Sequence, residues 1–231
     1  MSTIFVTGAG TDVGKTFVTC GLIAELRRRG RAVAAFKPLA SGFDPARAAA
    51  SDPGALLTAM GEPITSANLD RIAPWRFAAP LAPDAAAAAE GKQVDFDAVV
   101  SFSRRVSGSA DLVVIEGVGG VMSPIAARHT VIDWISALGS PALLVTGSYL
   151  GAQSHALTAL AALRARTIPV RAMVVSETTD TTISLADTVR SLARFTGSMP
   201  IVALPRLASS ALHPAFATLG DLFCCDAARV K

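Results

Sequence analysis

The chain has 231 residues, of which 51% are hydrophobic and 17% charged, so it can bury a large core and does not have the composition of a disordered protein. Its 21 basic and 18 acidic residues give a net charge of +3, a balance that provides no argument for nucleic-acid binding. No Ser/Gly-rich or highly charged linker divides the chain, and we therefore expect residues 1–231 to form one domain.

Apolar segments rich in strand-forming residues alternate with helical segments along the chain. The predicted strands cover residues 3–7, 32–36, 111–116, 142–146, 170–175 and 201–204, and the predicted helices cover residues 16–29, 85–89, 96–107, 131–138, 153–166 and 182–195. Strands that are apolar almost throughout are typical of a parallel sheet covered on both faces. The alternation therefore predicts an α/β fold built on a doubly wound, mostly parallel sheet.

A glycine-rich loop joins the first predicted strand to the first predicted helix, where residues 6–16 read VTGAGTDVGKT. In this context the backbone N–H groups and the helix dipole hold phosphates, Lys15 reaches the β and γ oxygens, and the Thr16 hydroxyl binds Mg²⁺. The usual motif G-x-x-x-x-G-K-[ST] has a glycine where this chain has Ala9, and Gly8 comes one residue earlier. The sequence thus predicts a P-loop NTPase-like sheet with a phosphate loop one residue longer than usual.

Polar residues also follow three later strands, at the edge of the sheet where open α/β folds bind ligands. Lys37 ends the second strand and is expected to point into the same crevice as Lys15. Glu116 ends the third strand in the position of a Walker-B carboxylate, which holds Mg²⁺ directly or through water. Residues 147–151 follow the fourth strand. Any one of these could be an ordinary turn, but together they predict a single nucleotide-dependent active site.

As a set, these segments resemble the ATP-dependent dethiobiotin synthetases. The resemblance covers residues 1 to about 155 and rests on the long phosphate loop and on the blocks Lys37-Pro38, Ser41-Gly42, Glu116-Gly117-Val118-Gly119-Gly120, Asp133-Trp134 and Leu150-Gly151 with His155. It implies a ring closure that uses Mg²⁺ and ATP: 7,8-diaminononanoate and CO₂ form a carbamate, ATP phosphorylates the carbamate, and the second amine displaces phosphate. The product is dethiobiotin, a precursor of biotin. Carbamate and γ-phosphate are both anionic, so cations must offset their charge as they meet.

The resemblance also implies the site residues. Lys15 and Lys37 would be catalytic; Asp12, Val13, Gly14, Lys15, Thr16, Ser176 and Pro205 would contact the nucleotide; Thr16, Asp52 and Glu116 would bind Mg²⁺; and Ser41, Gly117, Gly119 and Gly151 would contact the substrate. Asp44 competes with Asp52, because the preceding loop differs in length from that of the family. Asp12 could orient a substrate amine or form an Asx turn. The substrate carboxylate would lie near residues 151–155, in a homodimer that shares this tail site.

Two positions depart from the family pattern. Ser176 stands where an asparagine often reads adenine, and Ser154 stands where a second asparagine is expected. The first departure leaves the base selectivity unpredicted, and the second weakens the expected contacts to the substrate tail. His155 is interpreted as a helix residue that makes a structural hydrogen bond, in preference to a substrate contact.

Other classes of protein fit the residues less well. A partitioning-type ATPase that acts on a protein partner shares the fold, but its loop carries an additional lysine where this chain has Ala9 and Gly10. A guanine-specific switch would need Asn-Lys-x-Asp, and the sole asparagine, Asn68, precedes Leu69. A paralogue that phosphorylates another carboxylate or carbamate stays open.

The cysteines and the start of the chain bear on the compartment. Cys20, Cys224 and Cys225 form neither a C-x-x-C pair nor a disulfide framework, and we expect all three to be reduced. The chain enters its first strand without an export leader and contains no apolar stretch long enough to span a bilayer. We therefore expect a cytoplasmic enzyme without a membrane partner. The role of residues 206–231 is not predicted.

Overall fold

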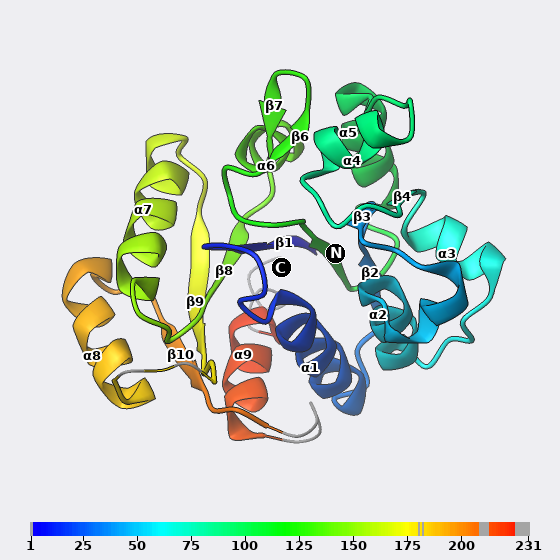
Figure 1. Cartoon of the computed structure of the whole chain (residues 1–231). Coiled ribbons are helices and arrows are strands. Elements are labelled where there is room, and N and C mark those ends of the chain that lie inside the picture. Colours follow the sequence, from blue (N-terminus) through cyan, green and yellow to red (C-terminus); the bar gives the residue numbers. More distant parts are fainter. Residues whose placement is uncertain (1, 180, 182, 208–212, 225–231) are drawn as a thin grey trace.

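Six parallel strands form the central sheet of the chain, for which the computed structural model describes residues 2–179, 181, 183–207 and 213–224. The strand order is β10-β9-β8-β1-β5-β2. The strands are β1 (Ser2–Gly8), β2 (Val33–Phe36), β5 (Leu112–Glu116), β8 (Ala142–Thr146), β9 (Val170–Ser176) and β10 (Ile201–Leu204). Figure 1 shows them at the centre of the molecule. The predicted parallel sheet is confirmed.

Helices cover both faces of this sheet, as a doubly wound fold requires (Figure 1). One face carries α1 (Lys15–Arg28), α2 (Asp52–Met60) and α9 (Pro214–Cys224), and the other carries α5 (Phe96–Val106), α6 (Val131–Leu138), α7 (Ala152–Ala165) and α8 (Leu185–Thr196). Every residue of β5 and β8 is buried, because each of these strands has helices on both sides. Among the described residues, no helix has the length and apolar character that crossing a membrane would need.

The predicted elements lie within a few residues of the observed ones, but the segment between β2 and β5 contains structure that the sequence pattern did not predict. There β3 (Leu39–Ser41) pairs in parallel with β4 (Trp75–Phe77), and the 3₁₀-helix η1 (Pro45–Ala50), α2 and α3 (Ser66–Ile72) lie between them. The predicted alanine-rich helix is α4 (Pro83–Ala89). A short hairpin of β6 (Pro124–Ala126) and β7 (His129–Thr130) precedes α6.

Capping explains why α2 forms although its first turn contains a proline and a glycine. The Ser51 hydroxyl accepts a hydrogen bond from the Gly54 N–H, which satisfies a backbone donor that the first turn leaves free. Pro53 is tolerated because the first turn needs no N–H from it. Gly61 ends the helix in the left-handed conformation with φ 70°. This helix places Asp52 at the edge of the sheet.

Aromatic packing fixes the centre of the core. Trp134 is fully buried, meets the Phe5 ring edge-on with 4.8 Å between ring centroids, and donates from Nε1 to Ser103 Oγ at 3.0 Å. Trp134 therefore serves core packing, and its N–H has a partner as a buried indole requires. Cys20 is a buried free thiol, as expected, while the Cys224 side chain and Cys225 lie outside the described residues.

Candidate active site

The phosphate loop connects β1 to α1 in the predicted strand-loop-helix arrangement. A Cβ atom on Gly8 would lie 2.8 Å from the Gly10 carbonyl oxygen, so only glycine fits where the chain turns. Gly14, with φ 91°, caps α1 without a side-chain hydrogen bond. The first N–H groups of the helix therefore face the loop without a capping side chain, as an anion-binding helix start requires.

Lys15 folds back over this loop. Its Nζ donates to the Gly10 carbonyl at 3.2 Å, and the residue is only 7% exposed. Burial, reinforced by the positive charge of Lys37, lowers the pKa of Lys15 to about 8. A bound anion close to the loop would stabilise the charged form of Lys15 and raise its pKa.

Lys37 is the centre of a buried charge cluster. Its Nζ lies 2.6 Å from Glu116 Oε1 and 2.8 Å from Asp52 Oδ2, and it also donates to the Gly117 carbonyl at 3.3 Å. Thr16 donates from its hydroxyl to the same Glu116 oxygen at 2.6 Å. The three predicted metal-binding residues are thus brought together around one lysine, although Thr16 and Glu116 are 100 positions apart in sequence.

The cluster favours the charged forms of Lys37 and Asp52. Burial lowers the pKa of Lys37, but the opposing effect of the Glu116 and Asp52 carboxylates is greater, so the pKa lies above its usual value. The pKa of Asp52 is lowered in turn: burial opposes ionisation, but the Lys37 ammonium outweighs it. An ammonium between two carboxylates is the expected way to retain charge in a buried site.

One oxygen of this cluster has no partner within the described part of the chain. Glu116 Oε2 is fully buried and accepts no hydrogen bond there. Ser41 Oγ is likewise buried and has no hydrogen-bond partner among the described residues. An unpaired buried carboxylate oxygen is uncommon and indicates a missing ligand. Two carboxylates and a hydroxyl are the hard oxygen donors that Mg²⁺ prefers, usually together with substrate phosphates, so these residues fit the ion. The described residues contain no cluster of three or more His, Cys, Asp or Glu that would form an all-protein metal site.

A cavity of about 760 Å³ opens over the phosphate loop and this cluster. Predicted site residues that line it are Asp12, Gly14, Lys15, Thr16, Lys37, Ser41, Asp52 and Gly119. Gly117 stands behind the cavity wall, where a Cβ atom would lie 2.7 Å from the Phe5 ring. Both lysines face one cavity, as the sequence predicted. We call it the lysine cavity.

A second cavity of about 520 Å³ lies on the other side of the loop, and the predicted residues that line it are Asp12, Val13, Gly14, Ser176 and Pro205. Several of its polar groups already have partners: Glu177 Oε2 accepts from the Arg206 N–H at 3.0 Å, and the Thr178 N–H donates to Ser148 Oγ at 3.0 Å. A cavity next to the helix start that is lined by both polar and apolar side chains has the dimensions of a small-molecule site.

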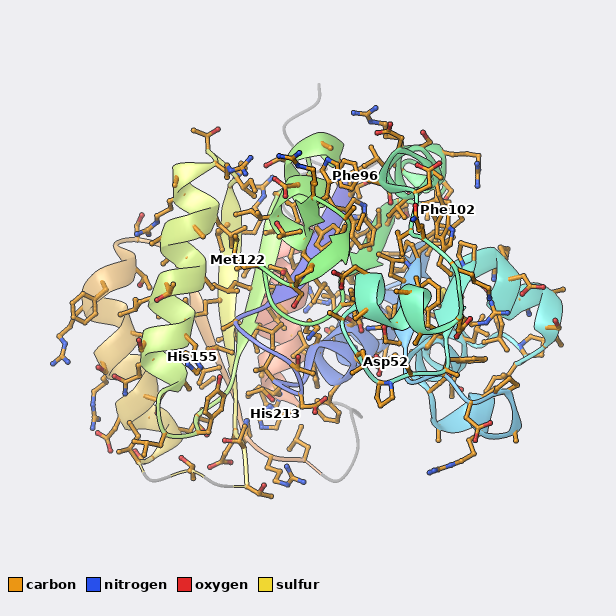
Figure 2. All side chains as sticks on the ribbon, turned by 45° about the horizontal axis from the view of Figure 1, so that its top comes forward. Asp52, Phe96, Phe102, Met122, His155 and His213 are labelled. Atoms are coloured by element: carbon orange, nitrogen blue, oxygen red, sulfur yellow. The ribbon has the colours of Figure 1, made fainter. Side chains whose placement is uncertain are left out.

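A third cavity, of about 480 Å³, lies between the loop after β5 and helix α7, and we call it the α7 groove. Its walls include Met122 and His155, which Figure 2 labels on the loop and on the helix. His155 Nδ1 lies 2.9 Å from the Tyr149 hydroxyl, so the predicted structural hydrogen bond exists. Gly151 caps α7 with φ 93° but does not line any of these three cavities.

Asp52 and Asp44, the two sequence candidates for the additional metal ligand, have different surroundings. Asp52 pairs with Lys37, whereas Asp44 accepts from the Ala46 N–H and caps the 3₁₀-helix η1. Figure 2 shows Asp52 at the start of α2. Asp12 adopts the left-handed conformation with φ 55°, and its carboxylate accepts no hydrogen bond from the described residues, so the Asx turn is absent.

Thr11, Ser123 and Tyr149 are among the lining residues that sequence reasoning missed. Thr11 lines all three, Ser123 lines the lysine cavity and the α7 groove, and Tyr149 lines the second cavity. Ser123 Oγ also accepts from the Gly120 N–H at 2.8 Å and so holds the glycine loop in shape. Its position just after the Gly119-Gly120 pair could have suggested this role, but no pattern pairs Tyr149 with His155.

The chain is similar in sequence to known proteins over most of its length. A family model described as an AAA domain matches residues 2–211. The chain is 52% identical over 209 residues to the "ATP-dependent dethiobiotin synthetase BioD" of Phenylobacterium zucineum, covering 89% of both chains, and 49% identical over 208 residues to that of Caulobacter sp. strain K31, again covering 89% of both.

Solved structures share the fold at much lower identity. The MinC:MinD cell division protein complex of Aquifex aeolicus matches with a TM-score of 0.58 at 13% identity, covering all of this chain and 98% of that one. The cell division ATPase MinD of Pyrococcus furiosus matches with a TM-score of 0.55 at 15% identity, covering 97% and 99%. At such identities the likeness shows a common P-loop fold and nothing about activity.

Proposed function

We propose, from the premise that this chain belongs to the ATP-dependent dethiobiotin synthetase family, that it closes the ureido ring of dethiobiotin from 7,8-diaminononanoate, CO₂ and ATP. It is an ATP-dependent ligase that acts on small molecules. The observation that carries the proposal at the level of residues is the lysine cavity, where Lys15 and Lys37 face the same space. Two cations in one cavity suit a reaction that joins two anions.

The two lysines would divide this work. Lys15 emerges from the phosphate loop and hydrogen-bonds to it, so we assign it to the β and γ phosphates of ATP. Lys37 lies across the cavity, held by Glu116 and Asp52, and we assign it to the carbamate and to the charge that develops during phosphoryl transfer. Ser41, Gly117 and Gly119 lie beside Lys37 or on the facing loop and would hold the diamine end. Gly151 stays a prediction.

Thr16, Asp52 and Glu116 would hold Mg²⁺, with Glu116 Oε2 as the oxygen that lacks a protein partner. When bound, Mg²⁺ would supply positive charge that offsets the negative charge of the phosphate oxygens. Asp52 is half-exposed and can move toward the phosphates, whereas Glu116 is fully buried and fixed at the end of β5. Lys37 would keep the Glu116 carboxylate oriented.

The second cavity would hold the nucleoside of ATP. Its residues Asp12, Val13 and Gly14 belong to the phosphate loop, whereas Ser176 ends β9 and Pro205 follows β10. This arrangement lets one nucleotide lie across the loop with its phosphates toward Lys15. The Ser176 hydroxyl can both donate to a base and accept from it, so this side chain by itself does not select adenine.

A partitioning-type ATPase acting on a protein partner is the second candidate that the sequence raised. No residue favours it, because Ala9 and Gly10 occupy the positions where that class carries its additional lysine. The structural neighbours of that class match at 13–15% identity, which supports the fold alone.

We also propose that the chain forms a homodimer, acts in the cytoplasm, and comprises one synthetase domain over residues 1–231. Two exposed apolar side chains near the α7 groove support the dimer: Leu150 is 81% exposed and Met122 is 58% exposed. Exposed apolar side chains of this kind would be removed from water where two copies associate. Light scattering of wild type and of a Leu150→Ser variant would test it, and a wild-type monomer with full activity would contradict the dimer.

The function is tested by a product analysis. Purified protein is incubated with diaminononanoate, bicarbonate, Mg²⁺ and each nucleoside triphosphate in turn, and the products are identified by mass. We expect dethiobiotin and phosphate, and no cyclic urea when bicarbonate or nucleotide is omitted. The absence of dethiobiotin with every nucleotide would refute the proposed function.

A further inference from the structure

Four consecutive apolar residues form one wall of the lysine cavity, from the end of β4 to the start of α4. They are Pro80, Leu81, Ala82 and Pro83, and we call them the apolar wall. The same cavity is lined by the charged side chains of Lys15, Lys37 and Asp52. No side chain of the apolar wall carries a hydrogen-bonding group, so its contribution to a reaction in this cavity must come from packing and from the exclusion of water.

The backbone holds the apolar wall against the strand that ends at Ser41. The Gly42 N–H donates to the Ala79 carbonyl at 3.0 Å. Gly42 has φ 70°, and a Cβ atom there would lie 3.3 Å from the Pro80 Cβ, so the two segments pack closely. Pro80 and Pro83 each restrict φ, which limits the conformations open to the residues between them. The apolar wall is therefore a fixed part of the cavity.

Leu81 is the part of this wall that meets solvent. It is 51% exposed, whereas Pro83 is buried. Among the described residues that line the lysine cavity, Leu81 is the only large apolar one with an exposed side chain. Lys37 is only 3% exposed, and the Ser41 hydroxyl oxygen is buried. A ligand beside Lys37 would thus have little water beneath it, and Leu81 can bury its side chain by packing over that ligand.

The proposed reaction contains a step at which water competes with the substrate, and the inference rests on that proposed function. In ring closure, the second amine attacks the carbonyl carbon of the phosphorylated carbamate. The new C–N bond forms, the C–O bond to phosphate breaks, phosphate leaves with the electron pair, and the amine loses a proton. Water can attack the same carbon and break the same bond. It regenerates the carbamate and releases phosphate, so that ATP is consumed without product.

We infer that the apolar wall, chiefly through Leu81, excludes water from the phosphorylated carbamate and so ensures that ATP consumption leads to ring closure. Leu81 is then a specificity-determining residue, because it favours the amine over water as the nucleophile. The choice depends on the relative rates of two attacks on one carbon. It can therefore change while the binding of both substrates stays the same.

The test measures phosphate and dethiobiotin together, at saturating diaminononanoate, bicarbonate, Mg²⁺ and ATP. In Leu81→Ser, the ratio of phosphate to dethiobiotin should rise about 2- to 10-fold above the wild-type ratio, which needs only a small change in the two competing barriers. The rate of phosphate release should stay within about twofold of wild type. Leu81→Met keeps an apolar side chain of similar volume and should retain the wild-type ratio.

Two controls identify the source of the additional phosphate. Omitting diaminononanoate or bicarbonate from the Leu81→Ser reaction should abolish it, because the carbamate cannot form. Ile183→Ser removes another aliphatic side chain, 41% exposed and outside all three cavities, and should leave the ratio unchanged. Circular dichroism shows whether each variant keeps its fold.

An unchanged ratio in folded Leu81→Ser would overturn the inference, even if both rates fell, since a purely structural role lowers them together. Additional phosphate that persists without diaminononanoate would also overturn it, because water would then be attacking ATP itself. Wild-type protein that makes no dethiobiotin would instead refute the proposed function. Product mass distinguishes this failure from the other two.

Discussion

Helix α1 carries a charged cluster at each end, and the two clusters are built differently. At its start, Lys15 and Thr16 face Lys37, Asp52 and Glu116 inside the lysine cavity, and one carboxylate oxygen of that cluster lacks a partner in the described chain. At its end, Glu25 accepts from Arg28 at 2.9 Å through both oxygens and from Arg29 at 2.7 Å.

The second cluster also joins two helices. Arg29 Nη1 lies 2.6 Å from Asp221 Oδ1, and Arg29 Nη2 donates to the Ala217 carbonyl at 2.8 Å, both on α9. The guanidinium groups of Arg28 and Arg29 reach solvent, with side-chain exposures of 56% and 22%. Paired charges at the solvent edge can stabilise a fold without any ligand, whereas an incompletely paired buried cluster is stabilised by what it binds. Substitutions at the two ends should therefore separate activity from stability.

The largest expected effect is that of Lys15→Ala. This change removes both a ground-state contact to the nucleotide and a cation that offsets transition-state charge, so kcat/KM should fall by about 10²- to 10³-fold or more. The fold should survive, because the Lys15 side chain donates to a carbonyl of its own loop. Steady-state kinetics with circular dichroism checks this, and Lys92→Ala, at an exposed lysine paired with Glu90, is the control. Wild-type kinetics in folded Lys15→Ala would remove Lys15 from the mechanism.

Lys37→Gln should lower kcat while leaving ATP affinity largely intact, because we assign Lys37 to the carbamate rather than to nucleotide binding. The structure adds a stability effect: Glu116 is fully buried and loses its cation, so Tm should fall by several degrees. Calorimetric titration with the nucleotide measures the affinity. If ATP affinity falls as far as in Lys15→Ala, Lys37 is a second phosphate clamp and our assignment is wrong.

Asp52 and Asp44 lie in one short segment, and substituting each of them separates a proposed metal ligand from a helix cap. Asp52→Asn should raise the Mg²⁺ concentration needed for half-maximal activity by about tenfold. Asp44→Asn retains an amide oxygen that can cap η1, so it should change neither the Mg²⁺ requirement nor kcat. Titration of activity with Mg²⁺ at saturating ATP distinguishes the two. An equal response from both variants would mean that Asp52 does not bind the metal.

The smallest effect is expected at the other end of α1. Hydrogen bonds from Arg28, helped by Arg29 and opposed by burial, lower the pKa of Glu25 from its ordinary 4.5 to about 2. Since the folded-state pKa is below the unfolded one, the stabilisation is complete above pH 4.5 and disappears as the pH falls toward 2. Ion pairs at the solvent edge contribute about 0.2–1 kcal/mol each, so Glu25→Gln should lower Tm by a few degrees at pH 7.

Thermal unfolding of wild type and Glu25→Gln between pH 7 and pH 3 measures this contribution. The difference in Tm should shrink below pH 4.5, and kcat/KM at pH 7 should stay within about twofold of wild type. A large loss of activity in the folded variant would show that the two ends of α1 are coupled, contrary to the comparison drawn above. Glu62→Gln, which removes the exposed pair with Arg71, serves as the surface control.

Much of the fold could be predicted because its strands carry a local pattern. Apolar runs such as Leu112–Glu116 are buried on both faces of a parallel sheet, and their period and composition identify them without any tertiary information. The segment from β3 to β4, residues 39–77, escaped prediction because its helices are short, begin with residues such as Pro53 and Gly54, and depend on caps and on packing against the sheet.

The sequence by itself determined the family, the phosphate loop and the strand ends that carry Lys37 and Glu116, since each of these is written in consecutive residues. Only the tertiary structure decided which charges meet: Lys37 and Glu116 are 79 positions apart, and their contact follows from the pairing of β2 with β5. The tertiary structure also distinguished Asp52 from Asp44, because Asp52 meets Lys37 from another part of the chain whereas Asp44 contacts the backbone of Ala46. The placement of Thr11 and Ser123 on the walls of the same two cavities likewise depends on long-range packing, which no local periodicity encodes.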